Sequence, residues 1–146
     1  QDLANAELFR AGGIYGPSRS SFDALRSGKA RIIKNTNQLF NRIHVDDICQ
    51  IIAKAISQPR ARRIINLVDG QPASQQDVIA YAAQIMGVIA PTAVSLEQAD
   101  LSEMARSFYT ANRKIKSCIY PDELGIDLLY PDFKAGLDAI HAAEIA

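Results

Sequence analysis

A glycine pair early in the chain is the first feature that could do chemistry. The stretch AGGIYG, residues 11–16, follows an apolar run and nearly matches the G-x-G-x-x-G turn that brings backbone N–H groups close to a phosphate. However, Pro17 follows at once, and Lys34 and Asn35 stand where that motif would have an acidic residue at the end of a second strand. The sequence therefore favours a tight turn over a dinucleotide-binding fingerprint.

Two arginines and two aromatic residues lie close to this stretch or to a later β-rich segment. Arg19 and Arg42 are the best candidates to face an anion, because a guanidinium binds phosphate or carboxylate through two parallel hydrogen bonds. Tyr15 and Phe40 could stack on a small ligand, although single aromatic residues more often belong to a core. His44 shares a strand face with Arg42, and we expect a hydrogen-bonded structural histidine rather than a catalyst.

The composition argues against several classes of function. Sixteen basic and sixteen acidic residues among 146 leave no net charge to draw the protein toward nucleic acid or an anionic membrane. No membrane span or signal peptide is visible, which favours a cytoplasmic protein, and two isolated cysteines without Cys/His spacing argue against a metal site. A nucleic-acid site on Lys29, Arg31 and Lys34 is a minor alternative, and it predicts steeply salt-dependent affinity.

The apolar pattern predicts one α/β unit over residues 1–146. Strands are expected over 7–15, 31–34, 38–45, 63–68 and a short VSL segment at 94–96. Helices are expected from Ser18 or Ser20 to Gly28, from a cap at Asp46 or Asp47 to Ile56, from Ser74 to Gly87, over 101–109, weakly over 116–124, and from Pro131 to Ile140. The alternation of strands and helices indicates a mostly parallel sheet.

Three stretches follow one another along the chain: LFRAGGIYGP, RIHVDDICQIIAKAI and RIINLVDGQPASQQDVIAYAAQIMG. Read in this order, they resemble the second half of the extended short-chain dehydrogenase/reductases, the group of the NAD-dependent epimerases and dehydratases. A fourth stretch, ELGIDLLYPDFKAGLDAI, is similar to the family's closing segment. The resemblance implies the carboxy-terminal part of a Rossmann-type doubly wound fold plus a small substrate-binding subdomain. It also implies an oxidoreductase or epimerase that uses NAD or NADP.

In that family a Tyr-x-x-x-Lys pair moves a proton while hydride passes to or from the nicotinamide. This motif and the coenzyme-binding sheet would precede Gln1, so the resemblance implies a missing amino-terminal half, no catalytic residue in this chain, and a chain that is inactive alone. Tyr130 and Lys134 match the spacing, with Ser117 upstream, but a helix that begins at Pro131 would leave Tyr130 outside it. We expect this match to be a coincidence.

The resemblance also assigns binding residues. Gly12, Gly13 and Ile14 would touch the nicotinamide side of the coenzyme through their backbone. The small-molecule substrate would meet a second set: Tyr15, Arg19, Phe40 and Arg42. The family usually has an arginine that holds the nucleotide diphosphate where Phe40 stands, and Phe40 cannot do this, which argues against a nucleotide-sugar substrate. The resemblance as a whole still implies a sugar-like or nucleotide-sugar-like substrate.

Two hypotheses follow for the whole chain. It is either the substrate-side half of an NAD(P)-dependent oxidoreductase or epimerase, or a non-catalytic binding or assembly module that keeps the same architecture. The first predicts an exposed apolar flank where the missing sheet would pair, and such a flank could join copies into a homo-oligomer.

Overall fold

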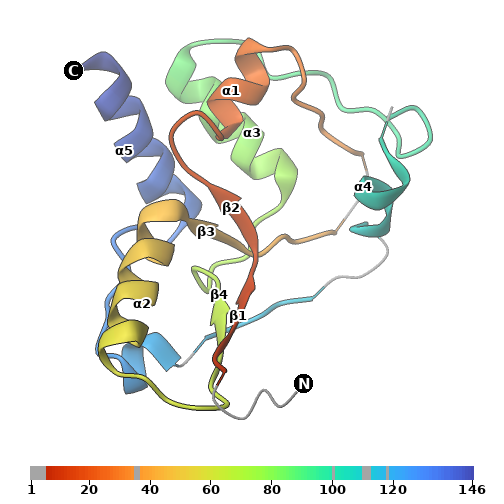
Figure 1. The fold of residues 1–146 in the computed structure, drawn as a ribbon. Helices are drawn as coiled ribbons and strands as arrows, with labels where there is room; N and C mark the ends of the chain where they lie inside the picture. The colour runs from red at the N-terminus through yellow and green to blue at the C-terminus, as the bar shows by residue number, and fades with distance from the viewer. Residues whose placement is uncertain (1–5, 35–36, 100, 110–112, 118) are drawn as a thin grey trace.

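Strands and helices alternate along the chain (Figure 1). The computed structural model describes residues 6–34, 37–99, 101–109, 113–117 and 119–146. The strands are β1 (Leu8–Ala11), β2 (Gly13–Tyr15), β3 (Arg42–His44) and β4 (Ile64–Leu67). The helices are α1 (Ser21–Arg26), α2 (Val45–Ser57), α3 (Gln75–Met86), α4 (Glu103–Ser107) and α5 (Phe133–Ile145), and η1 (Ile119–Glu123) is one π-helical turn. None of these helices is long and apolar enough to cross a bilayer.

The strand expected over residues 7–15 forms two short strands with different partners. β1 pairs in parallel with β4, and β2 pairs in parallel with β3. The change of partner falls at Gly12, whose N–H donates to the Leu67 carbonyl, whereas the N–H of Gly13 donates to the Asn41 carbonyl. A Cβ on Gly12 would lie 2.8 Å from the Asn41 carbonyl oxygen, so this crossing requires glycine.

Two of the three apolar clusters among the described residues join most of the elements. The first joins α2, β3, β4 and η1, with Ile43, Ile51 and Ile65 fully buried. The second joins α1, α3 and α5, which lie together in the upper part of Figure 1, around Phe22 and Leu137. Both clusters meet the β2–β3 pair, which therefore lies between the two layers.

Local capping signals explain most helix boundaries. Ser20 caps α1 with a capping box, and Ser74 caps α3, which ends at Gly87 with φ 65°, as the sequence predicts. The prediction for the last helix is wrong at its start. Asp132 caps α5 by accepting from the N–H of Ala135, so the helix begins at Phe133 and Pro131 lies before the cap.

Several other predicted elements are shorter than expected. The segments 31–34 and 94–96 share only a bridge between Ile33 and Val94, and the helix expected over 101–109 is reduced to α4. Ile32 packs with Ile79 of α3 in a third cluster, so this segment buries an apolar residue against a helix and forms a single bridge instead of a full strand. Periodicity alone does not separate these two outcomes.

The β1–β4 pair is open on one side. All four residues of β1 are exposed, including Leu8 at 44% and Phe9 at 38%. The N–H of Leu8 donates to Arg63 and that of Gly12 to Leu67, so the alternate residues Phe9 and Ala11 direct their backbone groups to the opposite edge. No strand among the described residues pairs with that edge. Parallel sheets are normally covered on both faces, and this pair is not.

Candidate functional site

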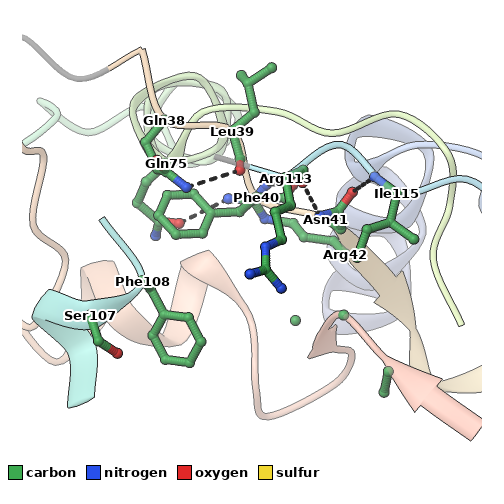
Figure 2. Close-up of a pocket in the computed structure, with 13 residues that line it drawn as sticks. Gln38, Leu39, Phe40, Asn41, Arg42, Gln75, Ser107, Phe108, Arg113 and Ile115 are labelled. Atoms are coloured by element: carbon green, nitrogen blue, oxygen red, sulfur yellow. Dashed lines mark hydrogen bonds between the residues drawn. The ribbon is translucent and has the colours of Figure 1, made fainter. Parts of the chain in front are cut away.

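A cavity of about 700 Å³ opens at the carboxyl end of β1, where the chain passes into β2. Its walls are residues 11–13, 38–42 and 107–108 together with Gln75, Arg113 and Ile115 (Figure 2). Among the described residues that line the cavity, Arg42 and Arg113 are the charged ones and none is acidic. Because carboxyl ends of parallel strands are the usual place for ligands in α/β folds, this cavity is the candidate site.

Arg42 forms a fixed cation in the wall of the cavity. Its side chain is 9% exposed, and it donates to the carbonyls of Phe40 (3.0 Å) and Ala73 (2.8 Å) and to Gln75 Oε1 (2.9 Å). The guanidinium also lies 5.7 Å from the centre of the Phe40 ring. Burial lowers the pKa of Arg42, and nearby Asp69 partly opposes that shift. Much of its hydrogen-bonding capacity is therefore used inside the protein.

A second cavity of about 210 Å³ adjoins the first and shares Gly13, Arg42 and Gln75 with it. The structure brings all seven predicted binding residues to these two cavities. Gly12, Gly13, Phe40 and Arg42 line the first, and Gly13, Ile14, Tyr15, Arg19 and Arg42 line the second. Their roles toward ligands stay predictions, because proximity to a cavity does not identify what fills it.

Tyr15 also has a structural role. Its hydroxyl donates to the Asp132 carbonyl at 3.3 Å, and a Cβ on Gly136 would lie 2.1 Å from that hydroxyl oxygen, so α5 packs closely on this ring. Burial raises the pKa of Tyr15, with a further contribution from Asp69. A tyrosine in this environment stays protonated, which argues against proton transfer by Tyr15.

His44 is a buried structural histidine, as the sequence predicts. Its Nδ1 accepts from the N–H of Asp46 at 3.2 Å and so caps α2, and its ring lies between Tyr15 (5.1 Å between centres) and Tyr130 (4.1 Å). Burial lowers the pKa of His44, which keeps the imidazole neutral. The prediction that Asp46 or Asp47 caps this helix is wrong, because the preceding histidine supplies the cap.

Asp47 instead joins α2 to the segment before α5. It is fully buried, and its carboxylate accepts from the backbone N–H groups of Leu129 (2.7 Å) and Tyr130 (3.1 Å) and from Gln50 Nε2 (2.7 Å). Two of these partners lie more than eighty residues away, so no local pattern in the sequence could reveal them.

Asp69 is a second buried carboxylate, at the carboxyl end of β4. Its Oδ1 accepts from the N–H of Gln71 at 2.9 Å, and its Oδ2 has no hydrogen-bond partner among the described residues. Burial raises the pKa of Asp69 to about 6, and Arg42 limits the rise. Asp69 follows the strand predicted over 63–68, and the apolar run before it was the available sign of burial.

The Tyr130-x-x-x-Lys134 match is a coincidence. Tyr130 lies outside α5 with its ring tilted against that of His44, whereas Lys134 places its ammonium 5.5 Å from the centre of the Tyr81 ring. Because the two side chains face different parts of the molecule, they cannot act as a proton-transfer pair. Among the described residues, no three histidine, cysteine or acidic side chains converge as metal ligands either.

Arg113 is the charged residue of the larger cavity that was not predicted from the sequence. The Asn41 side chain holds its backbone in place: Nδ2 donates to the Arg113 carbonyl at 2.6 Å, and Oδ1 accepts from the N–H of Ile115 at 2.9 Å. These bonds join positions more than seventy residues apart. The basic composition of residues 113–116 was the only local signal.

No family model matches the sequence, and no curated protein matches it. Among solved structures, a conserved protein of unknown function from Silicibacter pomeroyi DSS is 41% identical with a TM-score of 0.87, and the match covers 96% of this chain and 49% of that protein. A human epimerase family protein solved with NADPH is 18% identical, with a TM-score of 0.76 over 97% of this chain and 50% of its own. The dTDP-glucose 4,6-dehydratase of Bacillus anthracis, solved with NAD, is 15% identical, with a TM-score of 0.69 over 95% and 44%.

The chain therefore spans about half the length of the solved structures it matches. The two enzymes of low identity establish the fold alone, and the relative from Silicibacter pomeroyi has no stated function. By its elements and their order, the chain has the α/β fold of the carboxy-terminal half of the Rossmann-like epimerases and dehydratases.

Proposed function

We propose that the chain is the substrate-side half of an NAD(P)-dependent epimerase or dehydratase, and that its larger cavity receives a sugar-like or nucleotide-sugar-like substrate. The observation that carries this proposal is the unpaired edge of β1, which ends at the cavity. Since parallel strands are rarely left uncovered, this edge is suited to receive a further strand of a coenzyme-binding sheet.

The exposed side chains of the β1–β4 pair support the same proposal. Leu8, Phe9 and Ile64 are 44%, 38% and 41% exposed, and the register places Leu8 opposite Ile64. Leaving these apolar groups in water is unfavourable by about 25 cal/mol for each Å² that a partner could cover. A sheet that continues past β1, with the helices that cover such a sheet, would bury Leu8, Phe9 and Ile64. Its next strand would supply partners for the outward backbone groups of Phe9 and Ala11.

The turn at Gly12 and Gly13 fits one wall of a nicotinamide site. Both N–H groups are already bonded, to the Leu67 and Asn41 carbonyls, so contact with a coenzyme would use the Cα atoms and carbonyls. Gly13 and Ile14 are exposed beside the cavity, where a flat ring could approach the backbone. When bound, a nicotinamide supplies the hydride acceptor or donor of such a reaction.

The residues of this chain would bind and orient the substrate rather than transfer its protons. Arg42 adds positive charge, Phe40 and Tyr15 add aromatic surface, and Arg19 lies at the rim of the smaller cavity. His44 is buried and Tyr15 stays protonated, so neither is placed as a general base. The proton-transfer groups of the proposed enzyme would come from the other half.

Coenzyme binding tests this proposal. We expect no thermal shift of the chain alone with NAD or NADP at about 1 mM, because a ligand that does not bind the folded state cannot stabilise it. We expect binding once the chain is joined to the part of the Silicibacter pomeroyi relative that it does not cover. The fluorescence of NADH and NADPH, titrated with the hybrid, measures this directly.

Each outcome of this experiment has a meaning. A shift of several degrees for the chain alone would show a complete coenzyme site within it and overturn the proposal. A folded hybrid that binds neither coenzyme would overturn it as well. A hybrid that binds coenzyme but turns over no sugar-like substrate would favour the non-catalytic module. Circular dichroism and a single unfolding transition establish that the hybrid is folded.

A further inference from the structure

We infer that Arg113 is the anion-binding residue of the larger cavity, and that the ligand of this cavity carries a carboxylate or phosphate beside an apolar group. The inference rests on the proposed function only in treating the cavity as the substrate site. The two can fail separately, because anion binding to this chain requires no coenzyme.

The guanidinium of Arg113 projects into the open space of the cavity on the side of Phe108 (Figure 2). Several other arginines of the chain bind groups within the protein. Arg26, Arg60 and Arg63 pair with glutamates, and Arg106 donates to three backbone carbonyls. The Arg113 guanidinium has no hydrogen bond or ion pair with any described residue, so its donors are available to a ligand.

The backbone that carries Arg113 is anchored, which separates it from an ordinary surface arginine. Asn41 binds the carbonyl of Arg113 and the N–H of Ile115, and Asn41 directly precedes β3. The start of the Arg113 side chain is thereby fixed at the cavity wall. Binding a ligand then orders only the side chain, which lowers the entropic cost of binding.

The charges in the cavity wall favour an anion. The described part of the lining contains Arg42 and Arg113 and no acidic side chain, so these residues make the local charge positive although the chain as a whole is neutral. Arg42 already donates to Phe40, Ala73 and Gln75. Arg42 therefore contributes mainly charge, whereas Arg113 offers the planar pair of donors that matches a carboxylate or phosphate.

The remaining walls favour an apolar group next to that anion. Phe108 is 59% exposed, and the Phe40 ring is held in place by the Tyr109 ring at 5.4 Å and by Arg42. An aromatic or ring-shaped group between these two phenylalanines would cover apolar surface that is now in water. Phenyl phosphate and benzoate combine both features, and benzyl alcohol has the same ring without the charge.

The experiment is a calorimetric titration of the chain with phenyl phosphate, benzoate and benzyl alcohol. We expect the two anions to bind more tightly than the alcohol, and their affinity to fall as salt is added. Arg113→Gln should weaken anion binding about tenfold or more, and Arg113→Lys should have a smaller effect, because it keeps the charge and loses the paired donors. Comparison of the two anions shows which one the site prefers.

Lys114→Gln is the matched control, because it removes the same charge from the adjacent exposed residue, which does not line the cavity. Since the Arg113 side chain has no partner among the described residues, its replacement should leave the thermal unfolding midpoint unchanged. The inference is overturned if the chain binds neither anion, or if Arg113→Gln and Lys114→Gln weaken binding equally. If anions bind through Arg113 while the hybrid binds no coenzyme, the proposed function fails and this inference stands.

Discussion

The helical side and the strand side of the molecule differ in how completely they bury their own apolar residues. On the helical side, Phe22 and Leu137 are 0% and 1% exposed between α1, α3 and α5. On the strand side, Leu8 and Phe9 of β1 remain more than one-third exposed. The helices therefore bury these apolar side chains against one another, whereas the strand side leaves apolar side chains and the outer edge of β1 without a partner among the described residues.

The largest expected effect contrasts a core residue with an edge residue. Phe22→Ala should lower the free energy of unfolding by about 3–5 kcal/mol, because it opens a cavity in a packed cluster. Phe9→Ala should cost less than about 1 kcal/mol, because the ring is already in contact with water. Urea unfolding monitored by circular dichroism measures both. Equal losses would show that the β1 edge is buried in the protein and would remove the contrast.

Self-association gives a sharper test of the open edge. We expect the mass from sedimentation equilibrium to rise with concentration, because outward backbone groups and exposed apolar side chains can pair β1 with a second copy. Phe9→Lys should weaken this association about tenfold, or about 1.4 kcal/mol. Ile56→Lys on α2 is the control, since Ile56 is 74% exposed away from the edge. A monomer at every concentration would contradict the prediction.

The contrast between the two sides also explains what the sequence could predict. The boundaries of α3 follow from Ser74 and Gly87, which act within one turn of the helix, and both were predicted. The seven predicted binding residues gather at two cavities because they flank neighbouring parallel strands. Such features depend on local chemistry and on strand order, which a sequence shows directly.

The features that were missed depend on contacts across long stretches of chain. The Asn41 side chain holds the backbone of Arg113 at the cavity, and Asp47 binds backbone N–H groups just before α5. Neither contact has a spacing that a sequence pattern could reveal. The division of the first strand at Gly12 depends on the close approach of Asn41 in space. These contacts determine the shape of the site, so the residues of the site were easier to predict than its geometry.

The smallest expected effect concerns the pH dependence of the strand side, where Asp69 ends β4. Its pKa is raised from 3.8 to about 6, so the folded state binds this proton more tightly than the unfolded state does. The stabilisation is complete below pH 4 and is lost as the pH rises through 6. A shift of this size corresponds to about 3 kcal/mol at pH 7. Asp69→Asn keeps an oxygen for the Gln71 N–H but leaves its buried amide nitrogen without a partner among the described residues, which costs about 1–3 kcal/mol. The variant should therefore be more stable than the parent by about 1 kcal/mol at pH 7, with no gain near pH 4.

Urea midpoints at the two pH values measure this difference, and Asp127→Asn, at an exposed aspartate, corrects for general charge effects. A gain for Asp69→Asn that is equal at pH 4 and pH 7 would show that the carboxylate carries no penalty in the folded state. The result also bears on the contrast between the two sides. In the hybrid, a sheet that continues past β1 would exclude more water from the end of β4, so the advantage of Asp69→Asn at pH 7 should grow there.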